Sequence, residues 1–182
     1  AAGGAKENRN GTHFMKTNNS LLILGAGQYG MVAKENAHTM GPFGKIAFLD
    51  DESTIANDSL GSYELYTDEY EYAVVAIGNP DVRLDYIRKL NASGFHLAAL
   101  ISPRAYVSPS ATVAGGAIIE PMAVINAGAS VGAGAVVCAG AIVNHNATVG
   151  AGCLLQCGSI VAAGKSMSEM TVLGYNAVFT GE

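Results

Sequence analysis

Residues 107–179 read VSPSATVAGGAIIEPMAVINAGASVGAGAVVCAGAIVNHNATVGAGCLLQCGSIVAAGKSMSEMTVLGYNAVF, and in them a bulky apolar residue returns at every sixth position. The series has no gap: Val107, Val113, Ile119, Ile125, Val131, Val137, Val143, Val149, Leu155, Val161, Met167, Leu173 and Phe179. The residue two positions earlier is small in nearly every hexad, Lys165 and Thr171 being the exceptions. A period of six fits neither an amphipathic helix nor a single half-buried strand, but it fits short strands separated by tight turns.

Each hexad is then one flat side of a coil, with its large residue inside and its small residue at a corner. Three hexads close a triangular coil, so the thirteen hexads make a little over four coils. A disordered low-complexity segment is the competing interpretation, but disorder gives β-branched residues no reason to keep a strict register. The pattern predicts a stacked parallel β-helix over residues 102–182, and it leaves the handedness open.

The first half alternates apolar runs with helical segments. The expected elements are a strand over Ser20–Leu24, a helix that follows the glycine-rich segment ending at Gly30 and runs through Met40, strands over Lys45–Leu49 and Tyr72–Ile77, a helix over Asp81–Ser93 and a strand over Phe95–Ile101. Such alternation predicts a small parallel α/β sheet over residues 15–101, with its ligand site beyond the carboxyl ends of the strands.

Three polar or glycine-rich segments follow these strands and are expected to converge. They are Gly25-Ala26-Gly27-Gln28-Tyr29-Gly30, Asp50-Asp51 and Gly78-Asn79. A glycine turn before a helix lets backbone N–H groups approach a phosphate, and a carboxylate after the second strand can accept hydrogen bonds from a ribose or a base. A turn that needs glycine only for packing is one alternative, and NAD binding is another, although no domain suited to hydride transfer follows.

Composition narrows the partners and the compartment. The net charge of −5 argues against nucleic acid, and no apolar run is long enough to cross a membrane. Three cysteines leave one unpaired in any disulfide scheme, which favours a reducing compartment such as the cytoplasm. Residues 1–14 lack apolar periodicity, and we interpret them as a remnant of recombinant expression that precedes a natural start at Met15.

His145 is the only histidine of the repeat region, and it lies two positions past an interior residue. It should therefore point outward near a turn, either into solvent or, in a trimer of prisms, into the groove between subunits, where an imidazole can take a proton from an attacking amine. Cys138 lies near the same groove, but no basic residue near it in sequence activates its thiol, so packing is the preferred interpretation. We expect no metal, because one histidine is too few for a zinc hydratase site.

Taken together, the two halves resemble the bacterial nucleotide-sugar N-acyltransferases of surface-glycan pathways, the hexapeptide-repeat group that acetylates UDP-4-amino sugars, together with the sialic-acid-associated acyltransferases. The resemblance rests on six stretches in order: LLILGAGQYG (21–30), IAFLDD (46–51), VVAIGN (74–79), ALISPRAYVSPSATV (99–113), VINAGASVGAGAVV (124–137) and IVNHNATVG (142–150). It implies a Rossmann-like domain followed by a left-handed parallel β-helix, a homotrimer, and acetyl-CoA as the acyl donor.

The resemblance also implies roles for individual residues. His145, with its neighbour Asn146, would be the general base that deprotonates the sugar amine. The nucleotide sugar, a UDP-amino sugar or a relative of it, would contact Ala26, Gly27, Gln28, Tyr29, Asp50, Asp51, Gly78 and Asn79. By position, acyl-CoA would contact Leu154, Ala163 and Gly174.

Two positions depart from the family pattern. Asn146 stands where an acidic residue usually follows the histidine, and an amide orients an imidazole without neutralising its protonated form. Leu154 replaces a second histidine, and the family has further coils and a C-terminal loop that grips CoA beyond the position of Glu182. An O-acyltransferase acting on a sugar and a catalytically reduced nucleotide-sugar-binding or scaffold protein therefore remain as alternatives.

Overall fold

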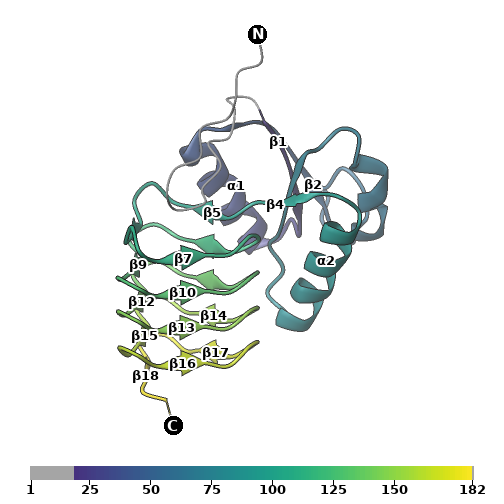
Figure 1. Cartoon of the computed structure of the whole chain (residues 1–182). Helices are drawn as coiled ribbons and strands as arrows, with labels where there is room; N and C mark the ends of the chain where they lie inside the picture. Colours follow the sequence, from purple (N-terminus) through teal and green to yellow (C-terminus); the bar gives the residue numbers. More distant parts are fainter. Residues whose placement is uncertain (1–18, 182) are drawn as a thin grey trace.

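The computed structural model describes residues 19–181 and has two parts, a small α/β sheet and a left-handed parallel β-helix whose coils stack away from it (Figure 1). The segment 1–14, interpreted above as an expression remnant, lies outside the described residues. Within residues 19–181 no helix combines the length and the apolar character needed to span a membrane.

The α/β part follows the alternation that the sequence predicts. Its elements are β1 (Asn19–Leu24), α1 (Gln28–Met40), β2 (Phe43–Leu49), the 3-10 helix η1 (Leu60–Tyr66), β3 (Tyr72–Val75), α2 (Pro80–Ala92) and β4 (His96–Leu97). The strands are parallel in the order β2-β1-β3-β4. The apolar runs of β1 and β3 are buried at nearly every position because elements cover both faces of the sheet.

The predicted strand over Phe95–Ile101 is wrong as a single element. The backbone N–H of Ala98 donates to the Ala73 carbonyl at 2.9 Å, whereas that of Leu100 donates to the Ala117 carbonyl at 2.9 Å. The chain therefore passes from one sheet to another between these residues. Both halves of the segment are apolar because both pack against buried surfaces. Hydropathy therefore cannot show where the chain leaves one sheet and enters the other.

The repeat region forms two-residue strands at the predicted period. They are β5 (Leu100–Ile101), β6 (Tyr106–Val107), β7 (Thr112–Val113), β8 (Ile118–Ile119), β9 (Val124–Ile125), β10 (Ser130–Val131), β11 (Val136–Val137), β12 (Ile142–Val143), β13 (Thr148–Val149), β14 (Leu154–Leu155), β15 (Ile160–Val161), β16 (Ser166–Met167), β17 (Val172–Leu173) and β18 (Val178–Phe179). Strands pair with partners 18 residues away, as in Val137↔Leu155, and the sixth-position residues fill the interior. The period and the interior set are thus confirmed, and β5 adds one hexad before Val107.

The prism has three faces. The docked face is formed by β5, β8, β11, β14 and β17, and its first four strands pack against the α/β part, whereas Val172 of β17 is 54% exposed. The apolar outer face consists of β6, β9, β12, β15 and β18, and the polar outer face of β7, β10, β13 and β16. We call the turns between the docked and apolar faces the near corner (102–105, 120–123, 138–141, 156–159, 174–177) and those between the two outer faces the far corner (108–111, 126–129, 144–147, 162–165).

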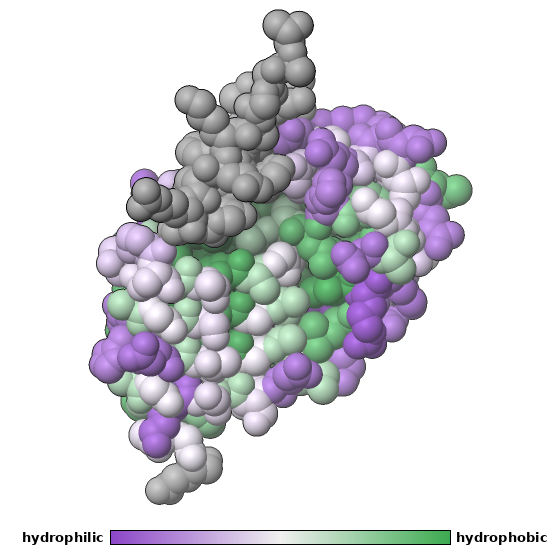
Figure 2. Space-filling view, viewed as in Figure 1, coloured by the Kyte–Doolittle hydropathy of each residue, from purple (hydrophilic) through white to green (hydrophobic). Residues whose placement is uncertain are grey.

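Helix α1 lies on the docked face through small side chains. Ala33 and Ala37 pack with the outward residues of this face, which include Ile118 and Val136. Asn36, also buried, donates from Nδ2 to the Ile119 carbonyl at 2.9 Å. Hydrophobic side chains gather along the seam between the coils and the α/β part (Figure 2), and their burial holds the two parts together.

A buried arginine joins α2 to the same seam. Arg83 is 1% exposed, and its guanidinium donates to the carbonyls of Gly134 (2.7 Å) and Gly152 (2.6 Å) in the coils. It also donates to the carbonyls of Ile77 (2.6 Å) and Gly78 (3.0 Å) after β3. Burial lowers the pKa of Arg83, but a guanidinium that satisfies four carbonyls stays charged. Arg83 is therefore a four-point clamp between the two parts.

Candidate active site

The glycine turn between β1 and α1 is shaped by two close approaches. Gly25 has φ +100°, in the left-handed region that favours glycine, and a Cβ there would lie 2.7 Å from the Ala76 carbonyl oxygen. A Cβ on Gly30 would overlap the Gly25 carbonyl oxygen. These contacts bring the start of α1 against the carboxyl ends of β1 and β3.

The N-terminus of α1 is open to a ligand. Gly27 is the N-cap residue and has no side-chain capping hydrogen bond, so the first N–H groups of the helix are available. Gly27 and Gln28 are exposed, and a Cβ built on Gly27 meets nothing within 4 Å. Free N–H groups and the helix dipole together favour an anion such as a phosphate.

The acidic pair Asp50-Asp51 lies at the same carboxyl edge of the sheet, and Asp50 bonds directly to the glycine turn. Asp50 accepts hydrogen bonds from the backbone N–H groups of Ala26 (2.7 Å), Glu52 (2.9 Å) and Ser53 (3.0 Å). These bonds, chiefly the one from Ala26, hold the pKa of the Asp50 carboxyl below its usual value. Asp51 is exposed and accepts from the Leu60 N–H at 2.9 Å. In the unliganded chain, Asp50 therefore orders the glycine turn.

The third predicted segment, Gly78-Asn79, is exposed and also caps α2. Asn79 caps α2, its side-chain oxygen accepting from the N–H groups of Asp81 (2.9 Å) and Val82 (3.2 Å). Gly78 is exposed and lies 3.8 Å from the Tyr29 ring, measured from a Cβ built on the glycine. The structure thus brings the glycine turn, the acidic pair and Gly78-Asn79 to one edge of the sheet.

Tyr29 links this edge to the β-helix. With Gly78, Arg83 and Leu154 it lines a cavity of about 10 Å³, room for roughly one water. Burial, and then the neighbouring Cys138, raise the pKa of Tyr29. Leu154 is 7% exposed and belongs to the packed docked face. Of the three residues predicted for acyl-CoA, Leu154 therefore lies beneath the α/β part of its own chain.

His145 lies at the far corner, on the edge of the prism opposite the docked face. Its side chain is exposed, and Nδ1 is 3.4 Å from Nδ2 of Asn146. Asn146 has φ +55°, a conformation that asparagine tolerates better than most residues. Ala163 occupies the equivalent position one coil later, while Gly174 is exposed at the near corner. Within one chain, His145 and the glycine turn are therefore on opposite sides of the prism.

A larger cavity lies away from these residues. Its volume is about 300 Å³, and Ser20, Glu71 and His96 are among its lining residues. These residues stand at the amino ends of β1, β3 and β4, opposite the glycine turn. The cavity thus lies at the edge of the sheet where parallel α/β folds do not place their ligands.

Sequence reasoning missed Arg83 and two residues of the near corner, Glu120 and Cys157. Arg83 sits in a helix rich in charged residues and carries no local signal of burial. Glu120 and Cys157 are about two coils apart, and the 18-residue coil length would have placed them in nearby layers.

Known proteins match both the α/β part and the β-helix of this chain. The family model described as the PglD N-terminal domain matches residues 20–90. The acetyltransferase domain of PglB from Neisseria gonorrhoeae, in complex with acetyl coenzyme A, is 30% identical with a TM-score of 0.85, over 88% of this chain and 82% of that chain. PerB from Caulobacter crescentus, in complex with CoA and GDP-perosamine, shares the fold at 24% identity and a TM-score of 0.81, over 90% of each chain. WeeI from Acinetobacter baumannii shares the fold at 15% identity and a TM-score of 0.68, over 88% of each chain.

Proposed function

The chain belongs to the hexapeptide-repeat nucleotide-sugar N-acetyltransferases, and we propose that it transfers the acetyl group of acetyl-CoA to an amino group on a nucleotide-linked sugar. The observation that carries this proposal is the open N-terminus of α1, which faces the β-helix across Tyr29. The acetyl-CoA bound to the PglB domain supports the donor, and the GDP-perosamine bound to PerB supports the class of acceptor.

The nucleotide sugar would bind at the carboxyl edge of the sheet. Its diphosphate would accept hydrogen bonds from the N–H groups of Gln28 and Tyr29, while Asp51 has a carboxylate oxygen left for the nucleoside. Asp50 would act by holding the turn, since its oxygens already accept from three backbone N–H groups. The sugar would extend towards the β-helix along Tyr29.

Two alanine substitutions in the turn should separate binding from folding. In Gly27→Ala the new methyl group has free space in the protein but lies where the diphosphate approaches, so we expect UDP to bind about tenfold more weakly, or by about 1.4 kcal/mol. Stability should fall by no more than about 1 kcal/mol, because alanine is a poorer N-cap residue than glycine. In Gly30→Ala the methyl group overlaps the Gly25 carbonyl, and we expect a loss of about 1–3 kcal/mol in the free energy of unfolding. Calorimetric titration with UDP and urea unfolding measure the two effects. Unchanged UDP affinity in Gly27→Ala would place the diphosphate elsewhere.

The acceptor amine would meet His145 of a neighbouring subunit. His145 cannot reach the glycine turn of its own chain, because it lies on the opposite edge of the prism. The apolar outer face ends at this edge and exposes large side chains, with Tyr106 and Val178 each 55% accessible. Association of three chains would cover such a surface and complete a cleft between subunits, which supports a homotrimer.

The transfer itself needs one base and one site for negative charge. The amine nitrogen attacks the thioester carbonyl carbon while Nε2 of His145 accepts the amine proton. Backbone N–H groups stabilise the oxyanion until the C–S bond breaks and the CoA thiolate leaves, taking up the proton that His145 holds. For Nε2 to act as the base, Nδ1 must carry the ring hydrogen, and Asn146 must then present its oxygen to Nδ1.

A panel of nucleotide sugars tests the proposal. Purified chain is incubated with acetyl-CoA and with UDP- or GDP-linked amino and hydroxy sugars, and product masses are recorded, because exposed Cys157 would react with thiol reagents. We expect acetylation of at least one amino sugar and of no hydroxy sugar. Acetylation of hydroxy sugars alone would indicate an O-acetyltransferase. Nucleotide binding without transfer to any sugar would indicate a binding or scaffold protein.

A further inference from the structure

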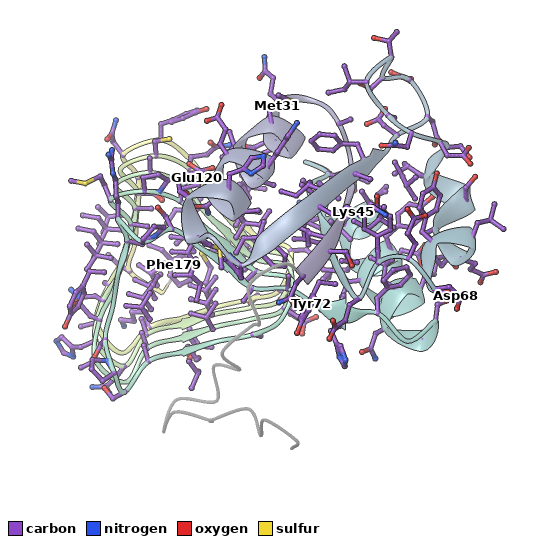
Figure 3. The ribbon with its side chains drawn as sticks, turned by 90° about the horizontal axis from the view of Figure 1, so that it is seen from above. Met31, Lys45, Asp68, Tyr72, Glu120 and Phe179 are labelled. Atoms are coloured by element: carbon purple, nitrogen blue, oxygen red, sulfur yellow. The ribbon has the colours of Figure 1, made fainter. Side chains whose placement is uncertain are left out.

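Three metal-ligating side chains meet at the near corner. Glu120, Cys138 and Cys157 come from three consecutive coils, and a carboxylate oxygen and the two Sγ atoms all lie within 4.8 Å of one another. The coil length of 18 residues stacks position 138 on position 120, and Cys157 lies one residue further along the next turn. Figure 3 shows Glu120 at the side of the prism that faces α1.

The carboxylate of this cluster is held in place, and no basic side chain among residues 19–181 forms an ion pair with it. Glu120 is 9% exposed, and its Oε2 accepts from the Ala139 N–H at 2.9 Å, which fixes the group over the Cys138 coil. The ion pairs found across residues 19–181 involve Lys45, Arg88 and Lys89, and none of them reaches Glu120. A buried carboxylate without a compensating cation is costly, and a bound cation would remove that cost.

The two thiols define which cation would fit. Cys138 is 3% exposed, and its Sγ lies within 4.8 Å of a Glu120 carboxylate oxygen and of the Cys157 Sγ, while Cys157 is exposed to solvent. Cys153, by contrast, donates from Sγ to the Ser168 carbonyl at 3.0 Å and lies outside the cluster. Two sulfur ligands and one carboxylate favour zinc over magnesium or calcium, which take oxygen ligands.

We propose that Glu120, Cys138 and Cys157 bind a zinc-class divalent cation, with a fourth coordination position open on the solvent side. Each metal–sulfur bond replaces an S–H bond, and both protons go to the solvent. Tyr29 of α1 packs against the buried cluster that contains Cys138, so a cation bound there would stabilise the part of the coils on which the start of α1 lies. The sequence predicted no metal because the repeat region has a single histidine, but stacking of the coils brings two cysteines and a glutamate together. The proposal does not depend on the transferase activity.

Cobalt titration of the full, reduced chain tests this site. Co²⁺ bound by thiolates absorbs in the near ultraviolet, and tetrahedral Co²⁺ absorbs in the visible range. We expect one Co²⁺ per chain with both absorptions, displaced by added Zn²⁺, in the wild type and in Cys153→Ala as the matched control. In Cys138→Ser and Cys157→Ser the ultraviolet band should lose about half its intensity, and affinity should fall at least about tenfold. Glu120→Gln should weaken binding while keeping the sulfur-derived band.

Circular dichroism of each variant excludes loss of the fold as the cause. The proposal is overturned if the wild type shows no thiolate band, or if the band is unchanged in the double Cys138→Ser/Cys157→Ser variant. A chain purified without reductant that carries a Cys138–Cys157 disulfide and no metal, shown by intact mass and metal analysis, would also overturn it.

Discussion

Replacement of Arg83 with methionine should lower the free energy of unfolding by about 3–5 kcal/mol, the range for removing one partner from a buried charged network. Methionine has a similar length and fills the space, but it donates no hydrogen bond. The carbonyls of Gly134 and Gly152 then stay buried without donors, at a cost of about 1–3 kcal/mol each. Because these bonds join α2 to the coils, the α/β part should detach before the β-helix unfolds.

The detachment can be measured by urea unfolding followed by circular dichroism, together with limited trypsin digestion at Arg104, which follows the segment between the two parts. Arg88→Met is the matched control on the same helix, since Arg88 is largely exposed and its ion pair with Asp85 contributes little. The stability loss in Arg83→Lys should lie between those of Arg83→Met and Arg88→Met, because an ammonium keeps the charge but lacks the planar set of donors of a guanidinium. A stability loss in Arg83→Met no larger than in Arg88→Met would show that the clamp is dispensable.

Removal of the His145 imidazole should lower kcat by about 10²–10⁴-fold, the usual contribution of a general base, with little change in the KM for either substrate. His38→Ala is the control, because His38 is also exposed but lies at the end of α1. Asn146→Asp should raise kcat, since a carboxylate would hold the hydrogen on Nδ1 and strengthen Nε2 as a base. Activity of His145→Ala within about threefold of the wild type would remove the histidine from the mechanism.

A cleft shared between subunits leads to a separate prediction for assemblies that combine two different inactive variants. Subunits carrying His145→Ala keep the glycine turn, and subunits carrying Gly27→Asp keep the imidazole but repel a diphosphate. Coexpression should restore part of the activity that each lacks alone, because some clefts then receive one intact part from each chain. No recovery in assemblies shown to contain both chains would contradict a site shared between subunits.

The β-helix could be predicted almost completely from the sequence because its structure is local and repetitive. Every hexad places its bulky apolar residue in the interior, as Val137 and Leu155 show, so thirteen repetitions support the same prediction. The strands and helices of the α/β part followed from apolar runs and glycine turns to within two residues at most ends, but α1 begins three residues earlier than expected and the 3-10 helix η1 was not predicted. The convergence of the glycine turn with Asp50 and Gly78 followed from the general rule for parallel sheets.

The contacts between distant segments could not be read in this way. Arg83 resembles any charged residue of a surface helix until the coils pack against α2, and Glu120 meets Cys138 and Cys157 only when three coils stack. The single strand expected over Phe95–Ile101 divides because two sheets compete for its backbone hydrogen bonds. Hydropathy and turn propensity act over a few neighbouring residues, whereas burial, charge pairing and ligand clusters depend on which surfaces meet in space.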